Sequence, residues 1–305
     1  MKYPLDAELK SLERHKIPAK LRLIPMMNAI SSRFKCESDT NVIVSEYDIA
    51  GYEGEMINTL VIEPRNTESK LPCLVYFHGG GFMLKSTAIN QQTVKEYVAK
   101  TPCKVVYVDY RLTPDNPFPI PVEDCFSAYQ WVLEHTEMLQ IDSDAIMIGG
   151  DSAGGNLAIG VTLMARDRGL TLPSKVMLIY PATDRRMLTE SMQKYTDTPV
   201  WDAKLSEMMW DAYLGEQPAE HIEYASPMEA DDLSSFPKTY VEVAEFDSLH
   251  DEGVAFYKRL VECGTEAVLH EVKGACHGFE NVFECQITRK CMARRMEWMS
   301  EKEYR

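Results

Sequence analysis

The chain has 305 residues, of which 47 are acidic and 32 are basic, so its formal net charge at neutral pH is −15. This balance argues against a nucleic-acid or anionic-membrane partner, because both need a basic face that neutralises phosphates. Apolar residues make up 45% and charged residues 26% of the chain, which is ordinary for a globular protein and excludes a collagen-like or disordered composition.

The N-terminal part of the chain predicts two short helices and then a strand pair. Apolar residues across positions 5–34 recur at helical spacing and are interrupted by Pro18 and Pro25. The apolar period then changes to two over residues 42–49 and 56–62, on either side of a glycine-containing turn. We therefore expect an antiparallel hairpin to open a sheet.

Short, continuously apolar runs follow the hairpin, as expected for strands that are covered on both faces. In chain order these runs are residues 74–77, 105–108, 146–148, 176–179, 239–244 and 267–272. Stretches of helical length separate them, at residues 91–100, 122–134, 157–168 and 251–262. Strands and helices in alternation predict a parallel, doubly wound α/β sheet.

Residues 183–226 do not fit this alternation, because they are polar and aromatic and show no strand pattern. Long segments of this kind in compact domains are usually lids or binding loops. We expect a cap over the mouth of the sheet, formed by residues 1–40 and an insertion at about 184–225, on a catalytic domain at 41–305. The methionines of the cap segments suit either an adaptable acyl pocket or the filling of gaps in a core; they include Met26, Met27, Met187, Met208 and Met209.

The strongest chemical signal is Gly150-Asp151-Ser152-Ala153-Gly154, a G-x-S-x-G motif directly after an apolar strand. A serine at a sharp strand-to-helix turn has a strained backbone, so its neighbours two positions away must lack Cβ atoms to let strand and helix approach. The first amides of the following helix then lie beneath the serine and stabilise developing negative charge. The motif predicts that Ser152 is a nucleophile, and a chance glycine-rich turn is the alternative.

A second glycine-rich run, His78-Gly79-Gly80-Gly81-Phe82, follows the predicted strand at 74–77. Consecutive glycines let backbone N–H groups converge on one point, as a tetrahedral oxyanion requires. Together with the Ala153 amide, this loop would complete an oxyanion hole. A flexible loop or a phosphate cradle is the alternative, although neither G-x-x-x-x-G-K-S/T nor G-x-G-x-x-G occurs in the chain.

A nucleophilic serine needs a base and an orienting acid, which follow it in the order acid, then histidine, on this kind of fold. Among the seven histidines, His277 lies just beyond the last predicted strand, at the sheet edge where open α/β folds bind ligands. For the acid we prefer Asp247, which falls in the loop after the preceding strand. Glu245 still belongs to that strand, and Asp251, the second choice, is predicted to be a helix N-cap.

Four motifs in order resemble the hormone-sensitive-lipase-like family of α/β-hydrolase esterases, and the resemblance runs from about residue 40 to the C-terminus. They are His78-Gly79-Gly80-Gly81, Val108-Asp109-Tyr110-Arg111-Leu112-Thr113-Pro114, Gly150-Asp151-Ser152-Ala153-Gly154-Gly155-Asn156 and Cys276-His277-Gly278-Phe279. The resemblance implies the α/β-hydrolase fold, with a mostly parallel eight-stranded sheet, helices on both faces and a helical cap. It assigns the catalytic triad to Ser152, Asp247 and His277. It assigns the oxyanion amides to Gly80, Gly81 and Ala153, with Gly79 as a further candidate.

Two positions depart from the family pattern: Asp115 stands where members usually have glutamate, and Ser248 stands where they usually have proline. Neither residue touches the proposed proton transfers, so the departures concern substrate fit more than mechanism. We also predict that Asp109, Arg111 and Asp124 form a structural charge network, because buried charges must be paired. The charged stretch 288–305 predicts a C-terminal helix with a solvated face.

The sequence therefore predicts a serine carboxylesterase that hydrolyses short- to medium-chain acyl esters of small molecules through an acyl-enzyme, without a cofactor or a metal. Two alternatives stay open: a non-catalytic small-molecule receptor on the same fold, and a deacetylase of sugars or amides. A homodimer stays open as well, because dimers are common among proteins that resemble this family.

Cysteine usage and the absence of targeting signals bear on the compartment. The eight cysteines are scattered without a C-x-x-C pair, which predicts reduced and mostly buried thiols. The first twenty residues lack the apolar core of a signal peptide, and no apolar run approaches the ~20 residues of a membrane span. Together these features favour the cytoplasm.

Overall fold

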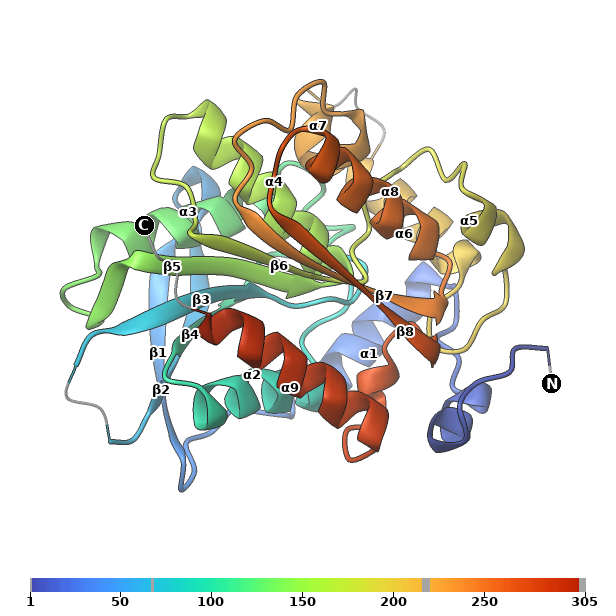
Figure 1. Ribbon diagram of the computed structural model, residues 1–305, viewed down its shortest axis with the longest axis horizontal. Helices are drawn as coiled ribbons and strands as arrows, with labels where there is room; N and C mark the ends of the chain where they lie inside the picture. Colours follow the sequence, from blue (N-terminus) through green and yellow to red (C-terminus); the bar gives the residue numbers. More distant parts are fainter. Residues whose placement is uncertain (1, 67–68, 216–219, 302–305) are drawn as a thin grey trace.

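The computed structural model describes residues 2–66, 69–215 and 220–301, and within them the strands form one eight-stranded sheet in the order β1-β2-β4-β3-β5-β6-β7-β8 (Figure 1). The strands are β1 Val42–Ala50, β2 Met56–Pro64, β3 Leu71–Phe77, β4 Lys104–Asp109, β5 Ile141–Asp151, β6 Lys175–Ile179, β7 Lys238–Phe246 and β8 Ala267–Cys276. β2 is antiparallel to both of its neighbours, β1 and β4. The other pairs are parallel, which confirms the predicted hairpin and the mostly parallel sheet.

Helices cover both faces of the sheet (Figure 1). The α-helices are α1 Ile24–Ser31, α2 Ala88–Lys100, α3 Ile120–Glu134, α4 Ala153–Asp167, α5 Glu190–Lys194, α6 Ala203–Leu214, α7 Ile222–Ala225, α8 His250–Glu262 and α9 Gln286–Ser300. Short 3-10 turns lie at Ala7–Arg14, Leu21–Leu23, Tyr52–Gly54, Pro227–Glu229 and Phe279–Asn281. In the view of Figure 1, α2 and α9 lie below the sheet and α3, α4 and α8 above it.

The central strands are continuously apolar because each face packs against a different core. In β3, Val75 and Phe77 belong to the core under α3, α4 and α8, whereas Leu74 and Tyr76 belong to the core under α2 and α9. All four side chains are at most 2% exposed. Parallel strands buried on both faces place their carboxyl ends at one common edge, and this edge is where the chemically active loops emerge.

The N-terminal segment is joined to the long insertion that follows β6. The Val200 N–H donates to the His15 carbonyl oxygen at 2.8 Å, and Lys16 donates its ammonium to the Thr198 carbonyl oxygen at 2.7 Å. In α1, the Asn28 side chain donates to the Met83 carbonyl oxygen at 2.9 Å, which ties this helix to the glycine-rich loop after β3. The insertion holds α5, α6 and α7; residues 216–219 of the predicted cap lie outside the described residues. The division into cap and catalytic domain stays a prediction.

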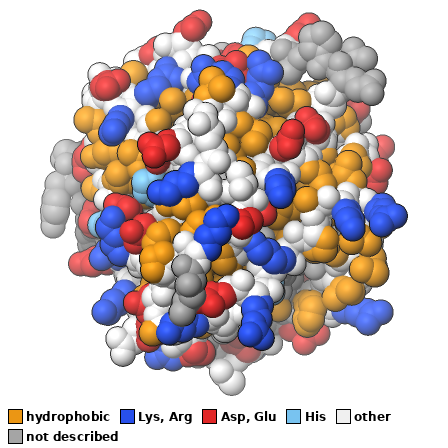
Figure 2. All heavy atoms as spheres, turned by 90° about the vertical axis from the view of Figure 1, so that its right-hand side faces the viewer, with side chains coloured by type: hydrophobic (Ala, Val, Ile, Leu, Met, Phe, Trp, Pro, Cys, Tyr) orange, Lys and Arg blue, Asp and Glu red, His pale blue; other side chains and the backbone are white. Residues whose placement is uncertain are grey.

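All eight cysteines are free, and five of them are buried, as their scattered spacing predicts. Among the described residues, no helix has both the length and the apolar character that crossing a membrane requires. On the face shown in Figure 2, acidic and basic side chains are interspersed with apolar ones, so neither sign of charge gathers there into a single patch.

Candidate active site

Ser152 occupies the sharp turn between β5 and α4. Its backbone has φ 56° and ψ −119°, a combination that residues with side chains rarely adopt. The turn brings α4 against the end of β3: a Cβ added at Gly154 would lie 2.0 Å from the Phe77 carbonyl oxygen. A Cβ at Gly150 would lie 2.4 Å from the carbonyl carbon of Gly154. The two glycines of the motif therefore have the steric role that the sequence predicts.

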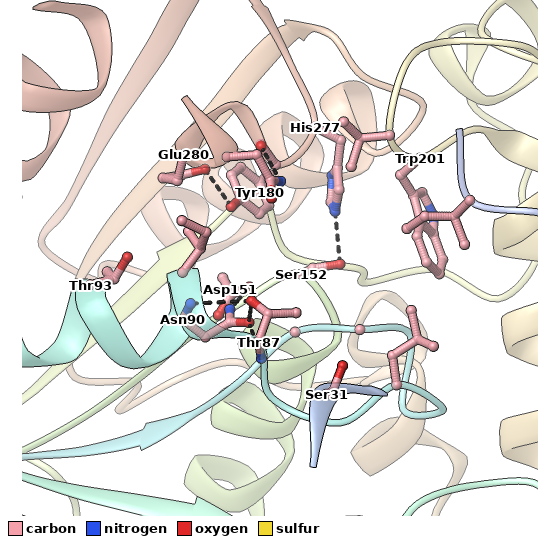
Figure 3. Close-up of a pocket in the computed structure, with 18 of the residues that line it drawn as sticks. Ser31, Thr87, Asn90, Thr93, Asp151, Ser152, Tyr180, Trp201, His277 and Glu280 are labelled. Atoms are coloured by element: carbon pink, nitrogen blue, oxygen red, sulfur yellow. Dashed lines mark hydrogen bonds between the residues drawn. The ribbon is translucent and has the colours of Figure 1, made fainter. Parts of the chain in front are cut away.

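Three side chains from different loops meet at this edge of the sheet. Ser152 Oγ lies 3.0 Å from His277 Nε2, and His277 Nδ1 lies 2.7 Å from Asp247 Oδ2. Figure 3 shows the first of these contacts as a dashed line between the Ser152 and His277 side chains. The side chains are nearly removed from water, with residue exposures of 2% for Ser152, 5% for His277 and 0% for Asp247. The structure thus brings together the nucleophile, base and acid that the sequence predicts.

A nearby backbone N–H holds the Asp247 carboxylate, and the two competing carboxylates accept hydrogen bonds from other backbone N–H groups. Asp247 Oδ1 accepts a hydrogen bond from the Leu249 N–H at 2.9 Å, which leaves Oδ2 for the imidazole. Glu245 accepts from the Gly274 N–H at 2.7 Å. Asp251 accepts from the Ser191 N–H at 2.8 Å, and it lies in the first turn of α8 behind the cap residue Leu249. The prediction that Asp251 is the N-cap is therefore wrong.

The glycine-rich loop and the start of α4 present backbone N–H groups beside the serine. Gly80 and Gly81 have φ angles of +113° and +61°, and in the part of the chain described here their N–H groups donate to no other group. Ala153 is the first residue of α4, so its N–H has no partner within the helix. The Ser152 N–H is already used, since it donates to the Ile179 carbonyl oxygen at 2.8 Å. The Gly79 N–H likewise donates to no group among the described residues, so the choice of Gly80, Gly81 and Ala153 as oxyanion donors over Gly79 stays a prediction.

The contacts of His78 hold the glycine-rich loop in place. Its ring stacks on Tyr110 at a centroid distance of 4.6 Å, and the Tyr110 hydroxyl donates to the His78 carbonyl oxygen at 2.7 Å. Burial lowers the pKa of His78, so the ring is neutral at neutral pH, and its Nδ1 lies 2.7 Å from the Gly79 carbonyl oxygen. A neutral ring that donates Nδ1–H to that oxygen fixes the loop without adding charge to the site.

A buried ion network behind the imidazole was missed by sequence reasoning. The Tyr180 ring packs on His277 at 4.4 Å between centroids, and its hydroxyl donates to Glu280 Oε2 at 2.7 Å. Arg295 pairs with both Glu280 and Glu242, and burial raises the pKa of Glu280. Arg295 is 1% exposed. The solvated face predicted for α9 therefore does not include Arg295, and residues 302–305 of that predicted helix lie outside the described residues.

The predicted network of Asp109, Arg111 and Asp124 exists only in part. Arg111 donates its Nε and Nη2 to Asp124 at 2.8 and 2.7 Å, and Asp124 is fully buried. Within the described residues the remaining side-chain hydrogen bond of Arg111 goes to the Tyr52 carbonyl oxygen, and Asp109 is exposed at the end of β4. Asp109 needs no partner because it stays in water, so its inclusion in the network is wrong.

A cavity of about 240 Å³ opens beside the serine (Figure 3). Ser152, His277 and Trp201 form one part of its wall, and the Trp201 ring also covers Gly81, where an added Cβ would lie 2.4 Å from the ring. Of the cap methionines named from the sequence, Met27 lines this cavity, whereas Met26 is exposed and Met209 is buried in the core. Met187 and Met208 pack against the same core. Of the two roles left open for these methionines, lining a pocket therefore fits Met27, and filling gaps in a core fits Met187, Met208 and Met209.

Comparisons with known proteins find esterases among the proteins that this chain resembles. A family model described as an α/β-hydrolase fold matches residues 74–281. The esterase LipI of Mycobacterium tuberculosis is 32% identical over 70% of this chain and 67% of its own length. An arylesterase of Saccharolobus solfataricus is 34% identical over 68% of this chain and 67% of its own length. Among solved structures, a bacterial heroin esterase has a TM-score of 0.88 at 31% identity over 97% of both chains. Esterase LipW from Mycobacterium marinum has a TM-score of 0.89 at 26% identity, over 97% of this chain and 95% of its own.

Proposed function

The chain belongs to the hormone-sensitive-lipase-like family of α/β-hydrolase carboxylic ester hydrolases, and on that premise we propose that Ser152, His277 and Asp247 are its catalytic triad. One observation supports the proposal most directly. Two hydrogen bonds in series, of 3.0 and 2.7 Å, connect the hydroxyl through the imidazole to a buried carboxylate. Such a series is what activates a serine whose own hydroxyl is a weak nucleophile.

In the first half of the reaction, Ser152 Oγ attacks the acyl carbon while His277 Nε2 takes the hydroxyl proton. The carbonyl oxygen becomes negative and is held by the N–H groups of Gly80, Gly81 and Ala153. His277 then gives the proton to the departing alkoxide, which leaves an acyl group on Ser152. Asp247 keeps Nδ1 protonated and stabilises the imidazolium, without itself taking the proton.

In the second half, water takes the place of the alcohol. His277 Nε2 removes a proton from the water, whose oxygen attacks the acyl carbon of the Ser152 ester. The same amides hold the second oxyanion, and its collapse breaks the bond to Oγ, which recovers its proton from His277. The products are a carboxylic acid and the free enzyme, so this mechanism requires neither a metal nor a cofactor.

The cavity size supports a preference for short acyl chains. A volume of about 240 Å³ is small beside the ~300–1,000 Å³ of typical ligand pockets. We expect kcat/KM for 4-nitrophenyl esters to be highest from acetate to hexanoate and to fall by about tenfold or more at decanoate, because the longer chain exceeds this space. Steady-state rates across the acetate-to-decanoate series test this, and a maximum at decanoate would contradict it.

Covalent labelling tests the proposed nucleophile. A fluorophosphonate reagent is expected to bind Ser152 stoichiometrically, because attack by an activated serine on phosphorus forms a stable adduct. Intact-mass and peptide mass spectrometry identify the labelled residue, with heat-unfolded protein as the control for non-specific reaction. A receptor on this fold would bind small esters without being labelled, and that result would contradict the proposal.

A further inference from the structure

Building on the proposed esterase function, we propose that the arm of the cavity beside α2 is a polar subsite for an ester that carries a hydroxyl group, in preference to an ester with a plain hydrocarbon chain. The α2 subsite consists of Tyr76, Asn90, Thr93, Asp151 and Glu280, all of which line the cavity next to Ser152. Figure 3 shows the labelled members of this set around the cavity, across from Trp201.

The inward face of α2 is polar where packing alone would make it apolar. A helix that covers a sheet normally presents apolar side chains to it, and further along α2 Val94, Tyr97 and Val98 do so. Asn90 and Thr93 are three residues apart, so they share one side of the helix, and both line the cavity. Asn90 also closes the capping box with Thr87 at the start of α2, which accounts for its polar side chain. Thr93 has no such role, and its polar side chain in this position favours a role in binding.

Thr93 supplies a hydroxyl that the protein leaves unused. Its residue is 6% exposed, and among the described residues the hydroxyl makes no hydrogen bond. In Figure 3 the Thr93 side chain stands at the cavity without a dashed line to any neighbour. A nearly buried hydroxyl gains free energy from any partner that enters the cavity, because leaving such a group unpaired is unfavourable.

Asp151, the neighbour of the nucleophile, supplies the complementary acceptor. Its Oδ1 accepts from the Tyr76 hydroxyl at 2.9 Å, and its Oδ2 has only a long contact of 3.4 Å with the Asn90 amide nitrogen. A carboxylate has about four lone-pair sites, so Asp151 keeps room for another donor. A hydroxyl on the substrate can donate to Asp151 and accept from Thr93 at the same time.

The charges around the cavity favour a neutral group over an ion. Glu280 and Arg295 offset each other in an ion pair, which leaves Asp151 and Lys85 as the remaining charged side chains that line the cavity. The Asp151 carboxylate disfavours a substrate carboxylate, and the Lys85 ammonium disfavours a substrate ammonium group. A hydroxyl both donates and accepts and carries no charge, so it suits all of these neighbours.

Matched ester pairs test the subsite on either side of the scissile bond. Ethyl 3-hydroxybutyrate is compared with ethyl 3-methylbutyrate for the acyl side, and 2-hydroxyethyl butyrate with propyl butyrate for the alcohol side. We expect kcat/KM to be at least about tenfold higher for the hydroxyl member of one pair, because only that member pairs the buried polar groups. Rates are measured by acid release in a pH-stat.

Variants at position 93 test whether the Thr93 hydroxyl causes the preference for hydroxyl-bearing esters. In Thr93→Val the two members of the pair are expected to differ in kcat/KM by no more than about twofold. In Thr93→Ser, which keeps the hydroxyl, the preference for the hydroxyl member is expected to persist. Thr59→Val is the matched control: Thr59 is also buried and its hydroxyl is also without a hydrogen bond among the described residues, but it lies in β2 and does not line the cavity. The control should keep the wild-type preference.

Three results would overturn the subsite. The first is equal kcat/KM within both pairs, and the second is a preference for the hydroxyl member that survives in Thr93→Val. The third is a kcat/KM ratio of butyrylcholine to its neutral analogue 3,3-dimethylbutyl butyrate that exceeds the ratio within the hydroxyl pairs. The plain esters separate this inference from the proposed function. A protein that cleaves both members of each pair equally well contradicts the subsite alone. A protein that cleaves no ester contradicts the proposed function.

Discussion

Replacing Ser152 with alanine is expected to lower kcat/KM for 4-nitrophenyl butyrate by about 10⁴-fold or more, with the folded structure retained. The loss is large because Oγ is the atom that forms the acyl-enzyme, and alanine offers no atom in its place. The fold is retained because alanine is smaller than serine and removes only the hydrogen bond to His277 Nε2. Steady-state rates and a circular dichroism spectrum of the same sample measure both effects.

A double-mutant cycle makes the test independent of any one substitution. If Ser152 and His277 act as one unit, His277→Ala alone is expected to cost about as much as Ser152→Ala, and the double variant no more than either. Thr162→Ala is a suitable control, since Thr162 is buried in α4 and its hydroxyl bonds only to the Ala158 carbonyl oxygen. Losses that multiply in the double variant would show that the two residues act separately.

The sheet could be predicted from the sequence because burial on both faces leaves a direct trace in it. β3, β4, β5 and β6 each contain an uninterrupted apolar run, which in β5 covers only residues 146–148, and the change to an alternating period at residue 42 marks β1 and β2. Burial on both faces of a parallel sheet makes consecutive residues of a strand apolar, so a single sequence is enough to detect it. Strand ends are less well defined: β8 continues to Cys276, directly before His277.

The meeting of Ser152, Asp247 and His277 could be predicted for a related reason. The turn around Ser152 and the loops that carry Asp247 and His277 each follow a strand directly, and parallel strands end at one edge. Their meeting point is therefore a consequence of topology. Choosing Asp247 over Asp251 needed only the position of each residue relative to the strand end.

The ion network behind His277 could not be predicted, because it depends on which side of α9 faces inward. Arg294 and Arg295 are neighbours in a charged stretch, yet Arg295 is buried against Glu242 and Glu280 while Arg294 faces outward. A charged run gives no apolar period from which to read the buried side. The same limit applies to Asp109, whose exposure depends on the neighbours of β4 and not on its own motif.

The packing of the cap could not be predicted either. Trp201 lies against Gly81 and near His277, and the backbone of Val200 pairs with that of His15, although these residues are far apart in the chain. Contacts between irregular segments have no periodicity, so the sequence indicates that a cap is present but not which side chains it places on the cavity.

Replacing Gly154 with alanine is expected to destabilise the folded state by more than about 4 kcal/mol, which is large for a single methyl group. The added Cβ would lie 2.0 Å from the Phe77 carbonyl oxygen and 2.7 Å from that of His78. Both contacts are with backbone, so no side-chain rotation can relieve them, and close-packed interiors transmit such strain. α4 would have to move away from the end of β3, and the glycine-rich loop that follows β3 would move with it. Urea unfolding followed by tryptophan fluorescence measures the change.

Gly169→Ala separates this steric clash from the ordinary effect of adding a side chain to a glycine. Gly169 follows α4, its φ is +69°, and a Cβ there would meet nothing within 4 Å. Its replacement is expected to cost only about 1–2 kcal/mol, which is the strain of a left-handed backbone. Because the clash at Gly154 displaces the loop that presents Gly80 and Gly81, any Gly154→Ala protein that does fold should also lose ester hydrolysis, whereas Gly169→Ala should keep it. A Gly154→Ala protein with wild-type unfolding midpoint and activity would mean that α4 and β3 are not packed as closely as their backbone positions require.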